Sequence, residues 1–191
     1  FMEFYSPDKG HIYVDGAELQ NFEVQEIRKA VVYVSQEDFL FTASVRENLK
    51  MGNEEISDEE MIEISRKMGV HQFVSKMERA YDSVLEERGK NLSKGQRQKL
   101  SLTRAILRHP KILILDEATS NMDSISEREI LNYIKGIRDI TLILISHRIN
   151  VIADSDCIYV LQKGNIVARG TDKQLKEQCK LYRQLYGEEE K

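Results

Sequence analysis

The sequence has little cysteine and no excess of basic residues. Cys157 and Cys179 are its two cysteines, and their spacing fits neither a disulfide framework nor a metal site, which favours reduced cytosolic thiols. Lys and Arg together number 28 against 32 Asp and Glu, so the formal net charge is −4. This charge argues against a protein that binds nucleic acid through bulk positive charge.

Long apolar runs are missing as well. No stretch approaches the roughly 20 apolar residues that span a bilayer, and the sequence does not open with a signal peptide. We therefore expect no direct membrane insertion, so that any role at a membrane would come through a partner protein. A hydrophobic content of 41% and a charged content of 31% instead fit a globular domain with a sizeable core.

Apolar runs of strand length alternate with helical patterns, which predicts an α/β fold with a mostly parallel sheet. The acidic, helix-rich stretch at about 44–109 predicts a helical subdomain inserted between α/β parts at 1–43 and 110–187, with one of its helices at 71–79. Strands are expected at residues 11–14, 31–34, 112–115, 142–145, 157–161 and 166–168, the last two joined by a hairpin turn.

Four patterns predict capping boxes at helix starts. In such a box a Ser or Thr and a Glu or Gln three residues later satisfy each other's backbone donors. The last of the four is expected to open the final helix. The four are Ser57–Glu60, Ser93–Gln96, Ser124–Glu127 and Thr171–Gln174.

Two acids follow the apolar run at 112–115. Asp116 is expected at the C-terminal edge of the sheet, where open α/β sheets bind ligands, and its carboxylate could hold Mg²⁺. Glu117 would point in another direction and could orient or deprotonate an attacking water. The alternative is structural, with two acids that end a strand and pair with Lys111 or Arg108.

Three other polar features could contact phosphate. The turn at 92–96, Leu-Ser-Lys-Gly-Gln, precedes a predicted helix whose positive end and free N–H groups could bind an anion. It could equally be a simple helix cap. His147 follows the run at 142–145 and could donate to a phosphate or hold a water, although a lone histidine is more often structural. Gln36 ends the run at 31–34 in the same way.

The order of these features resembles the nucleotide-binding domain of ABC transporters over about residues 1–186. Five motifs carry the resemblance, with Lys94 standing where the family signature has its first glycine. They are Gln36 at the Q-loop, Leu-Ser-Lys-Gly-Gln at 92–96 for the signature, Ile-Leu-Ile-Leu-Asp-Glu at 112–117 for Walker B, Ser-Asn-Met-Asp at 120–123 for the D-loop and Ser-His at 146–147 for the H-loop.

Two further segments resemble the exporter branch of this family. Residues 39–48 are similar to the segment after the Q-loop of exporters, and 81–89 to their X-loop, with Glu86 where a glycine is usual. In that family these surfaces receive the coupling helices of transmembrane domains. Glu87 is therefore a candidate coupling residue, or else a solvated surface charge.

The resemblance implies a specific mechanism. Two such domains would pack head to tail around two ATP molecules, attached to transmembrane domains at the cytoplasmic face of a membrane, and would power export. Residue roles follow from the matching motifs. The signature residues Ser93, Lys94, Gly95 and Gln96 would contact the partner's ATP, and Asp116 and Gln36 would bind Mg²⁺. Glu117 would be the general base, His147 would position the γ-phosphate or water, and Asp123 would bridge the two sites.

One family motif has no match. A P-loop needs G-x-x-x-x-G-K-[ST], but the one Gly-Lys pair here, Gly89-Lys90, is followed by Asn91 and has Val84 in place of the first glycine. By family analogy the P-loop and the N-terminal strands would precede Phe1. We therefore expect an N-terminally truncated, P-loop-NTPase-like domain that alone binds ATP weakly and hydrolyses none.

Two alternatives compete with an exporter ATPase. A soluble ABC ATPase of translation or DNA repair is disfavoured by the exporter-like segments and the negative charge. A degenerate, non-catalytic subunit that contributes a signature half-site is disfavoured because Glu117 and His147 are both present.

Overall fold

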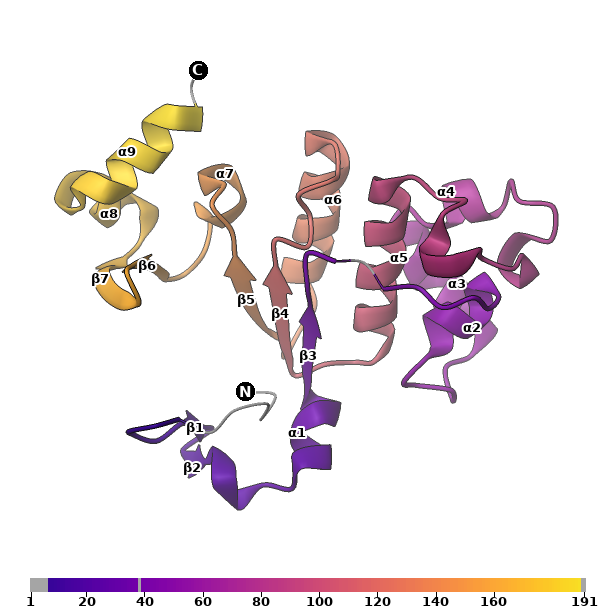
Figure 1. Ribbon diagram of the computed structural model, residues 1–191, viewed down its shortest axis with the longest axis horizontal. Coiled ribbons are helices and arrows are strands. Elements are labelled where there is room, and N and C mark those ends of the chain that lie inside the picture. The colour runs from indigo at the N-terminus through magenta and orange to yellow at the C-terminus, as the bar shows by residue number, and fades with distance from the viewer. Residues whose placement is uncertain (1–6, 38, 190–191) are drawn as a thin grey trace. The chain divides into compact units, whose positions relative to one another are not determined.

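A computed structural model describes residues 7–37 and 39–189 of the chain (Figure 1). The chain divides into two compact units between Ile143 and Leu144. Strands β3 (Val31–Val34), β4 (Ile112–Asp116) and β5 (Thr141–Ile145) form one sheet in that order. β3 and β4 run parallel, as predicted.

β3 and β4 form strands because they are almost continuous runs of Val, Ile and Leu, as expected of parallel strands covered on both faces. Most of their side chains are buried, with Tyr33 the exposed exception on β3. β5 is less buried along its length. The register pairs Val31 with Ile112 and Val34 with Leu115, so both strands end at the same edge.

Helices fill the sequence between β3 and β4. They are α2 (Val45–Lys50), α3 (Asp58–Lys67), α4 (His71–Val74) and α5 (Lys94–Leu107), followed after β4 by α6 (Ser124–Lys135). The helix expected over 71–79 was wrong in length, since it ends at Val74. α4 has no side-chain cap at its start, and Phe73 and Val74 have low helix propensity.

The N-terminal part of the first unit is a small hairpin and a helix. β1 (Tyr13–Val14) and β2 (Ala17–Glu18) pair antiparallel across Asp15 and Gly16, which both have positive φ, as a tight two-residue hairpin requires. The expected strand at 11–14 is thus shorter. α1 (Val24–Ala30) then leads directly into β3.

The capping predictions had mixed outcomes. The boxes at Ser93–Gln96 and Thr171–Gln174 are confirmed. At Ser57 half of the box forms, because Ser57 accepts from the Glu60 N–H while the Glu60 carboxylate pairs with His109 Nε2 at 3.2 Å. The box at Ser124 was wrong.

Asp123 caps α6 in place of Ser124. Its side chain accepts from the Ser126 N–H at 2.9 Å. The helix starts one residue earlier than expected, because Asp is as good an N-cap as Ser and lies three residues before Ser126.

The second unit contains α7 (Ile149–Ile152), the antiparallel strands β6 (Ile158–Gln162) and β7 (Asn165–Gly170), α8 (Asp172–Gln178) and α9 (Lys180–Glu189). The predicted hairpin is confirmed, with Lys163 and Gly164 at positive φ in its turn. Thr171 opens α8, which is followed by α9, so α8 is not the final helix. None of the helices in the described ranges combines the length and apolar character of a bilayer span.

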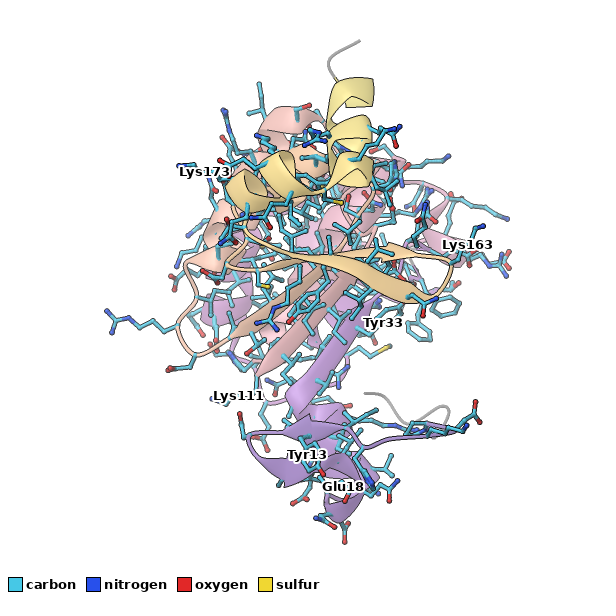
Figure 2. The ribbon with its side chains drawn as sticks, turned by 90° about the vertical axis from the view of Figure 1, so that its left-hand side faces the viewer. Tyr13, Glu18, Tyr33, Lys111, Lys163 and Lys173 are labelled. Atoms are coloured by element: carbon cyan, nitrogen blue, oxygen red, sulfur yellow. The ribbon has the colours of Figure 1, made fainter. Side chains whose placement is uncertain are left out.

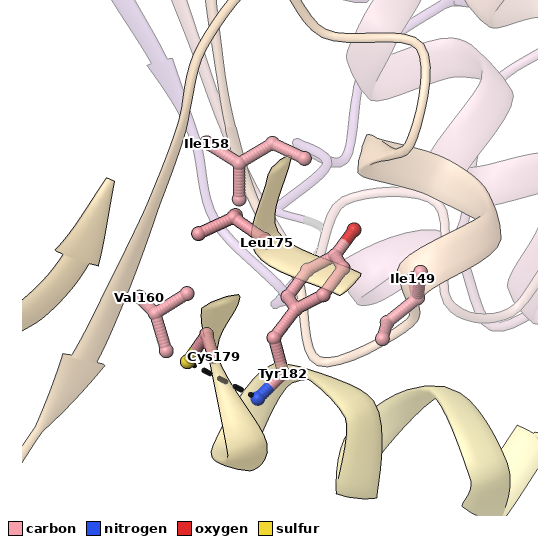
Figure 3. Close-up of a cluster of buried hydrophobic side chains, with 6 residues drawn as sticks. All are labelled: Ile149, Ile158, Val160, Leu175, Cys179 and Tyr182. Carbon is pink, nitrogen blue, oxygen red and sulfur yellow. Dashed lines mark hydrogen bonds between the residues drawn. The ribbon is translucent and has the colours of Figure 1, made fainter. Parts of the chain in front are cut away.

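A compact apolar cluster holds the second unit together (Figure 3). Tyr182 lies at its centre, where its N–H donates to Cys179 Sγ at 3.4 Å and its hydroxyl donates to Asp172 at 2.8 Å. The cluster joins α7, the β6–β7 hairpin, α8 and α9 through Ile149, Ile158, Val160, Leu175, Cys179 and Tyr182.

Candidate functional site

Asp116 ends β4 with its side chain partly exposed at the edge of the sheet. Tyr33 on β3 donates its hydroxyl to Asp116 Oδ2 at 2.7 Å. This hydrogen bond, reinforced by partial burial and by the Asp116 charge, raises the pKa of Tyr33 above its usual value. Sequence reasoning missed Tyr33, because its proximity to Asp116 depends on the β3–β4 register, which no sequence motif encodes.

Of the two cations considered as structural partners for the acids, Arg108 makes a different hydrogen bond. Arg108 instead donates from Nη2 to the carbonyl of Arg28 at 2.9 Å. Asp116 takes a neutral hydroxyl partner at the strand end.

Glu117 occupies a left-handed backbone conformation with φ of 53°. Such a conformation is uncommon outside glycine and costs on the order of 1 kcal/mol or more. It turns the chain sharply after β4 and starts the loop in which the Ser120 N–H donates to the Glu117 carbonyl. This change of backbone direction directly after Asp116 is compatible with the expectation that the two acids point differently.

Asp116 and Gln36 follow the ends of neighbouring parallel strands. Val34 pairs with Leu115, so both residues lie at the same edge of the sheet, and Gln36 is exposed. In the described ranges no three His, Cys, Asp or Glu side chains gather as a metal cage. Mg²⁺ needs no such cage, since it commonly uses one or two carboxylates with water and phosphate oxygens. Asp116 therefore fits this kind of binding.

The turn at 92–96 forms the start of α5. The Ser93 hydroxyl accepts from the Gln96 N–H at 3.2 Å, and the Ser93 N–H donates to Gln96 Oε1 at 2.9 Å. Gly95 lies against the loop at 120–123, because a Cβ added there would be 3.1 Å from the Asn121 carbonyl oxygen. The packing thus leaves little room for a side chain at Gly95.

A cavity of about 560 Å³ lies beside this turn. It brings together two of the sequence-predicted segments, the signature turn and the D-loop. The N-terminal ends of α5 and α6 both contribute to it, and each carries a partial positive charge. Its lining residues are Gly69, Gln72, Phe73, Lys76, Ser93, Lys94, Gly95, Gln96, Lys99, Asn121, Met122 and Asp123.

Basic side chains outnumber acidic ones around this cavity. Lys76, Lys94 and Lys99 line it, against Asp123. Lys99 Nζ donates to Ser126 Oγ at 2.9 Å. Sequence reasoning missed Lys76 and Lys99. The signal for Lys99 was its position four residues after Gly95 on one helix face, whereas Lys76 follows α4 and its place could not be read from a motif.

The loop at 120–123 is fixed to α5 and α6. Gln98 is 0% exposed and its Oε1 accepts from the Asn121 N–H at 3.0 Å. Asp123 caps α6, and the pKa of Asp123 is lowered first by the Ser126 backbone N–H, then by the Ser126 hydroxyl and the nearby Lys99 charge. Asp123 therefore stays ionised while it holds the start of α6.

His147 belongs to the second unit. Its side chain is exposed just after β5 and before α7. The Ser146 hydroxyl accepts from the Arg148 N–H at 3.0 Å, which shapes this short connection.

The two exporter-like segments at 39–48 and 81–89 lie side by side. Ser44 and Val84 form an antiparallel bridge, and Leu85 donates its N–H to the Ala43 carbonyl at 2.9 Å. Phe39 and Phe41 pack edge to face at 4.8 Å between ring centroids, and both are exposed, as is Val84. This surface is defined here as the Phe39–Val84 patch.

Charged residues flank the Phe39–Val84 patch. Arg46 pairs with Asp58 and with Asp82. The Glu87 carboxylate lies 3.4 Å from Lys90 Nζ in an exposed ion pair, which is worth little on its own.

Residues 1–120 match the sequence family described as ABC transporter. The chain is 43% identical over 176 residues to the heterocyst differentiation ATP-binding protein HepA of Nostoc sp., covering 92% of this chain and 29% of that protein. It is 40% identical over 190 residues to the leptomycin B resistance protein pmd1 of Schizosaccharomyces pombe, covering 97% of this chain and 14% of that protein.

A solved exporter structure shares the fold of this chain. The structure of a bacterial Atm1-family ABC exporter with ATP bound superimposes with a TM-score of 0.95 at 30% identity, over 100% of this chain and 34% of that one. The chain thus spans about a third or less of the length of these relatives. It belongs to the ABC transporter family, as part of the ATP-binding domain of exporter-type members.

Proposed function

We propose that this chain is part of the ATP-hydrolysing domain that powers an ABC exporter, working as a head-to-tail pair. The observation that carries the proposal is the cavity at the starts of α5 and α6. It has three lysines, one carboxylate and two helix N-termini, a combination suited to the terminal phosphates of a nucleotide. In a pair, Ser93, Gly95 and Gln96 would face the ATP held by the partner domain.

The residues at the sheet edge supply the hydrolytic chemistry in this proposal. Asp116 and Gln36 would hold Mg²⁺, which neutralises charge on the phosphates when bound. Glu117 would accept a proton from the attacking water, and His147 would position that water or the γ-phosphate. Asp123, already ionised, would bridge the two sites of the pair.

The Phe39–Val84 patch is proposed as the contact with transmembrane domains of the same transporter. Exposed aromatic and aliphatic side chains held by a rigid backbone suit a protein interface. This would place the domain at the cytoplasmic face of a membrane.

Helices α2 to α5 would form the proposed helical subdomain at about 44–109, between core parts at 1–43 and 110–187.

The 191-residue chain alone is expected to bind ATP weakly and to show no turnover, because its sequence holds no G-x-x-x-x-G-K-[ST] motif. Backbone N–H groups and the lysine of that motif are the main stabilisers of β- and γ-phosphate charge. Phosphate release from the purified chain with Mg-ATP is the measurement. Mg²⁺-dependent turnover above background would contradict the expectation.

Lys94→Glu tests the proposed phosphate site. In the complete protein, reversing this charge beside the turn at 93–96 should lower ATP hydrolysis about tenfold or more, because like charges placed together cost several kcal/mol. Steady-state ATPase kinetics give the readout. The effect should appear first as a raised KM for ATP, since a charge at the rim of the site acts on nucleotide capture.

Lys173→Glu is the matched control. Lys94 and Lys173 are both exposed and both lie in the first turn of a helix, α5 and α8 respectively, so the two reversals act alike on the helix dipole. Figure 2 shows Lys173 on the second unit. Equal ATPase activity of the two variants would show that the signature turn is not part of the phosphate site.

A further inference from the structure

Tyr33 reaches Asp116 because of the strand register. Tyr33 pairs with Ile114 across β3 and β4, and Asp116 lies two residues beyond Ile114, so it projects on the same face of the sheet. A diagonal neighbour of this kind is within reach of a tyrosine side chain. The resulting bond from Tyr33 Oη to Asp116 Oδ2 is 2.7 Å long. Figure 2 labels Tyr33 on the sheet.

A hydroxyl is a suitable partner for a carboxylate that must also bind a cation. It satisfies one oxygen without bringing a positive charge that would compete with the metal. Arg or Lys at position 33 would neutralise Asp116, and Phe would leave the carboxylate free to rotate. Within the described ranges, Tyr33 is the hydrogen-bond partner of the Asp116 side chain.

We propose that Tyr33 is a positioning residue for the metal-binding carboxylate of Asp116. Its hydroxyl holds Oδ2, which would keep Oδ1 in one orientation for a cation or a cation-bound water. The inference rests on the proposed role of Asp116 at Mg²⁺. Hydrogen-bond partners of metal ligands orient them, and their loss typically lowers metal affinity about 10–100-fold.

The test uses Tyr33→Phe in the complete protein, made in a Glu117→Gln background so that bound ATP persists. Mn²⁺ serves as the probe, and its nucleotide-dependent binding is titrated by electron paramagnetic resonance. We expect the Mn²⁺ dissociation constant to rise about tenfold or more, with metal-free ATP affinity unchanged. Because Tyr33 is 43% exposed, the unfolding temperature should change by no more than about 2 °C.

Two controls separate positioning from a general effect. Tyr159→Phe removes the hydroxyl of another half-exposed tyrosine, on β6, and should leave Mn²⁺ binding unchanged. In an Asp116→Asn background, Tyr33→Phe should have no further effect, since the two residues act as one unit. Additive losses would overturn the inference.

The outcomes also distinguish this inference from the proposed function. Unchanged Mn²⁺ affinity in Tyr33→Phe, with normal binding in the parent protein, overturns the role of Tyr33 alone. A loss of ATP affinity in the absence of metal also overturns it, because Tyr33 would then contact the nucleotide. A parent protein with no nucleotide-dependent Mn²⁺ binding overturns the proposed function itself.

Discussion

Glu117→Gln in the complete protein is expected to retain ATP binding and to lower hydrolysis by roughly 10²–10⁴-fold, the usual effect of losing a general base. Glutamine has the size of glutamate but cannot accept the proton of the attacking water. Neither residue has an advantage over the other in the left-handed conformation at this position, where φ is 53°. The loss should therefore fall on chemistry and leave folding unchanged.

Three measurements check this result: ATP binding at equilibrium, single-turnover hydrolysis and unfolding temperature. Glu129→Gln, at an exposed site on α6, is the matched control and should hydrolyse ATP like the parent. A hydrolysis rate within a few-fold of that of the parent protein would show that Glu117 is not the general base. Loss of ATP binding would instead assign it to nucleotide capture.

Tyr182→Ala is expected to destabilise the second unit by about 3–5 kcal/mol, the usual cost of removing a large buried aromatic side chain. Tyr182 is 1% exposed and contacts the cluster that joins α7, the β6–β7 hairpin, α8 and α9. Tyr182→Phe keeps the ring and removes the hydrogen bond to Asp172. It should cost about 1 kcal/mol.

Denaturant unfolding followed by circular dichroism gives the total change in stability, and hydrogen exchange locates it. Amides of residues 149–182 should lose protection in Tyr182→Ala, while those of β3 and β4 keep theirs. Tyr159→Ala, at a half-exposed site, should change stability by less than about 1 kcal/mol. A uniform loss of protection over both units would show that they unfold together.

The sequence was most informative where one local pattern determines the structure. The strands at 31–34 and 112–115 follow from runs of apolar residues, and the cap at Ser93 follows from the three-residue spacing to Gln96. Prediction from the sequence failed where two neighbouring residues could each cap the same helix. At the start of α6 both Asp123 and Ser124 can cap, and Asp123 takes the role by accepting from the Ser126 N–H.

Contacts between distant segments could not be predicted. Tyr33 and Asp116 are 83 residues apart and meet through strand register. Lys76 lines the cavity from the segment that follows α4. The motif order proposes candidate residues for the site, whereas the neighbours that contact them, such as Tyr33 and Lys76, required the three-dimensional structure.

The buried bond between Gln98 and Asn121 has a mechanical consequence. The start of α5 and the loop before α6 are tied by a side chain with no solvent contact, and Gly95 lets their backbones touch. These two contacts favour joint movement of the start of α5 and the loop over sliding of one past the other. A displacement of the start of α5 is therefore expected to carry the loop that holds Asp123 with it.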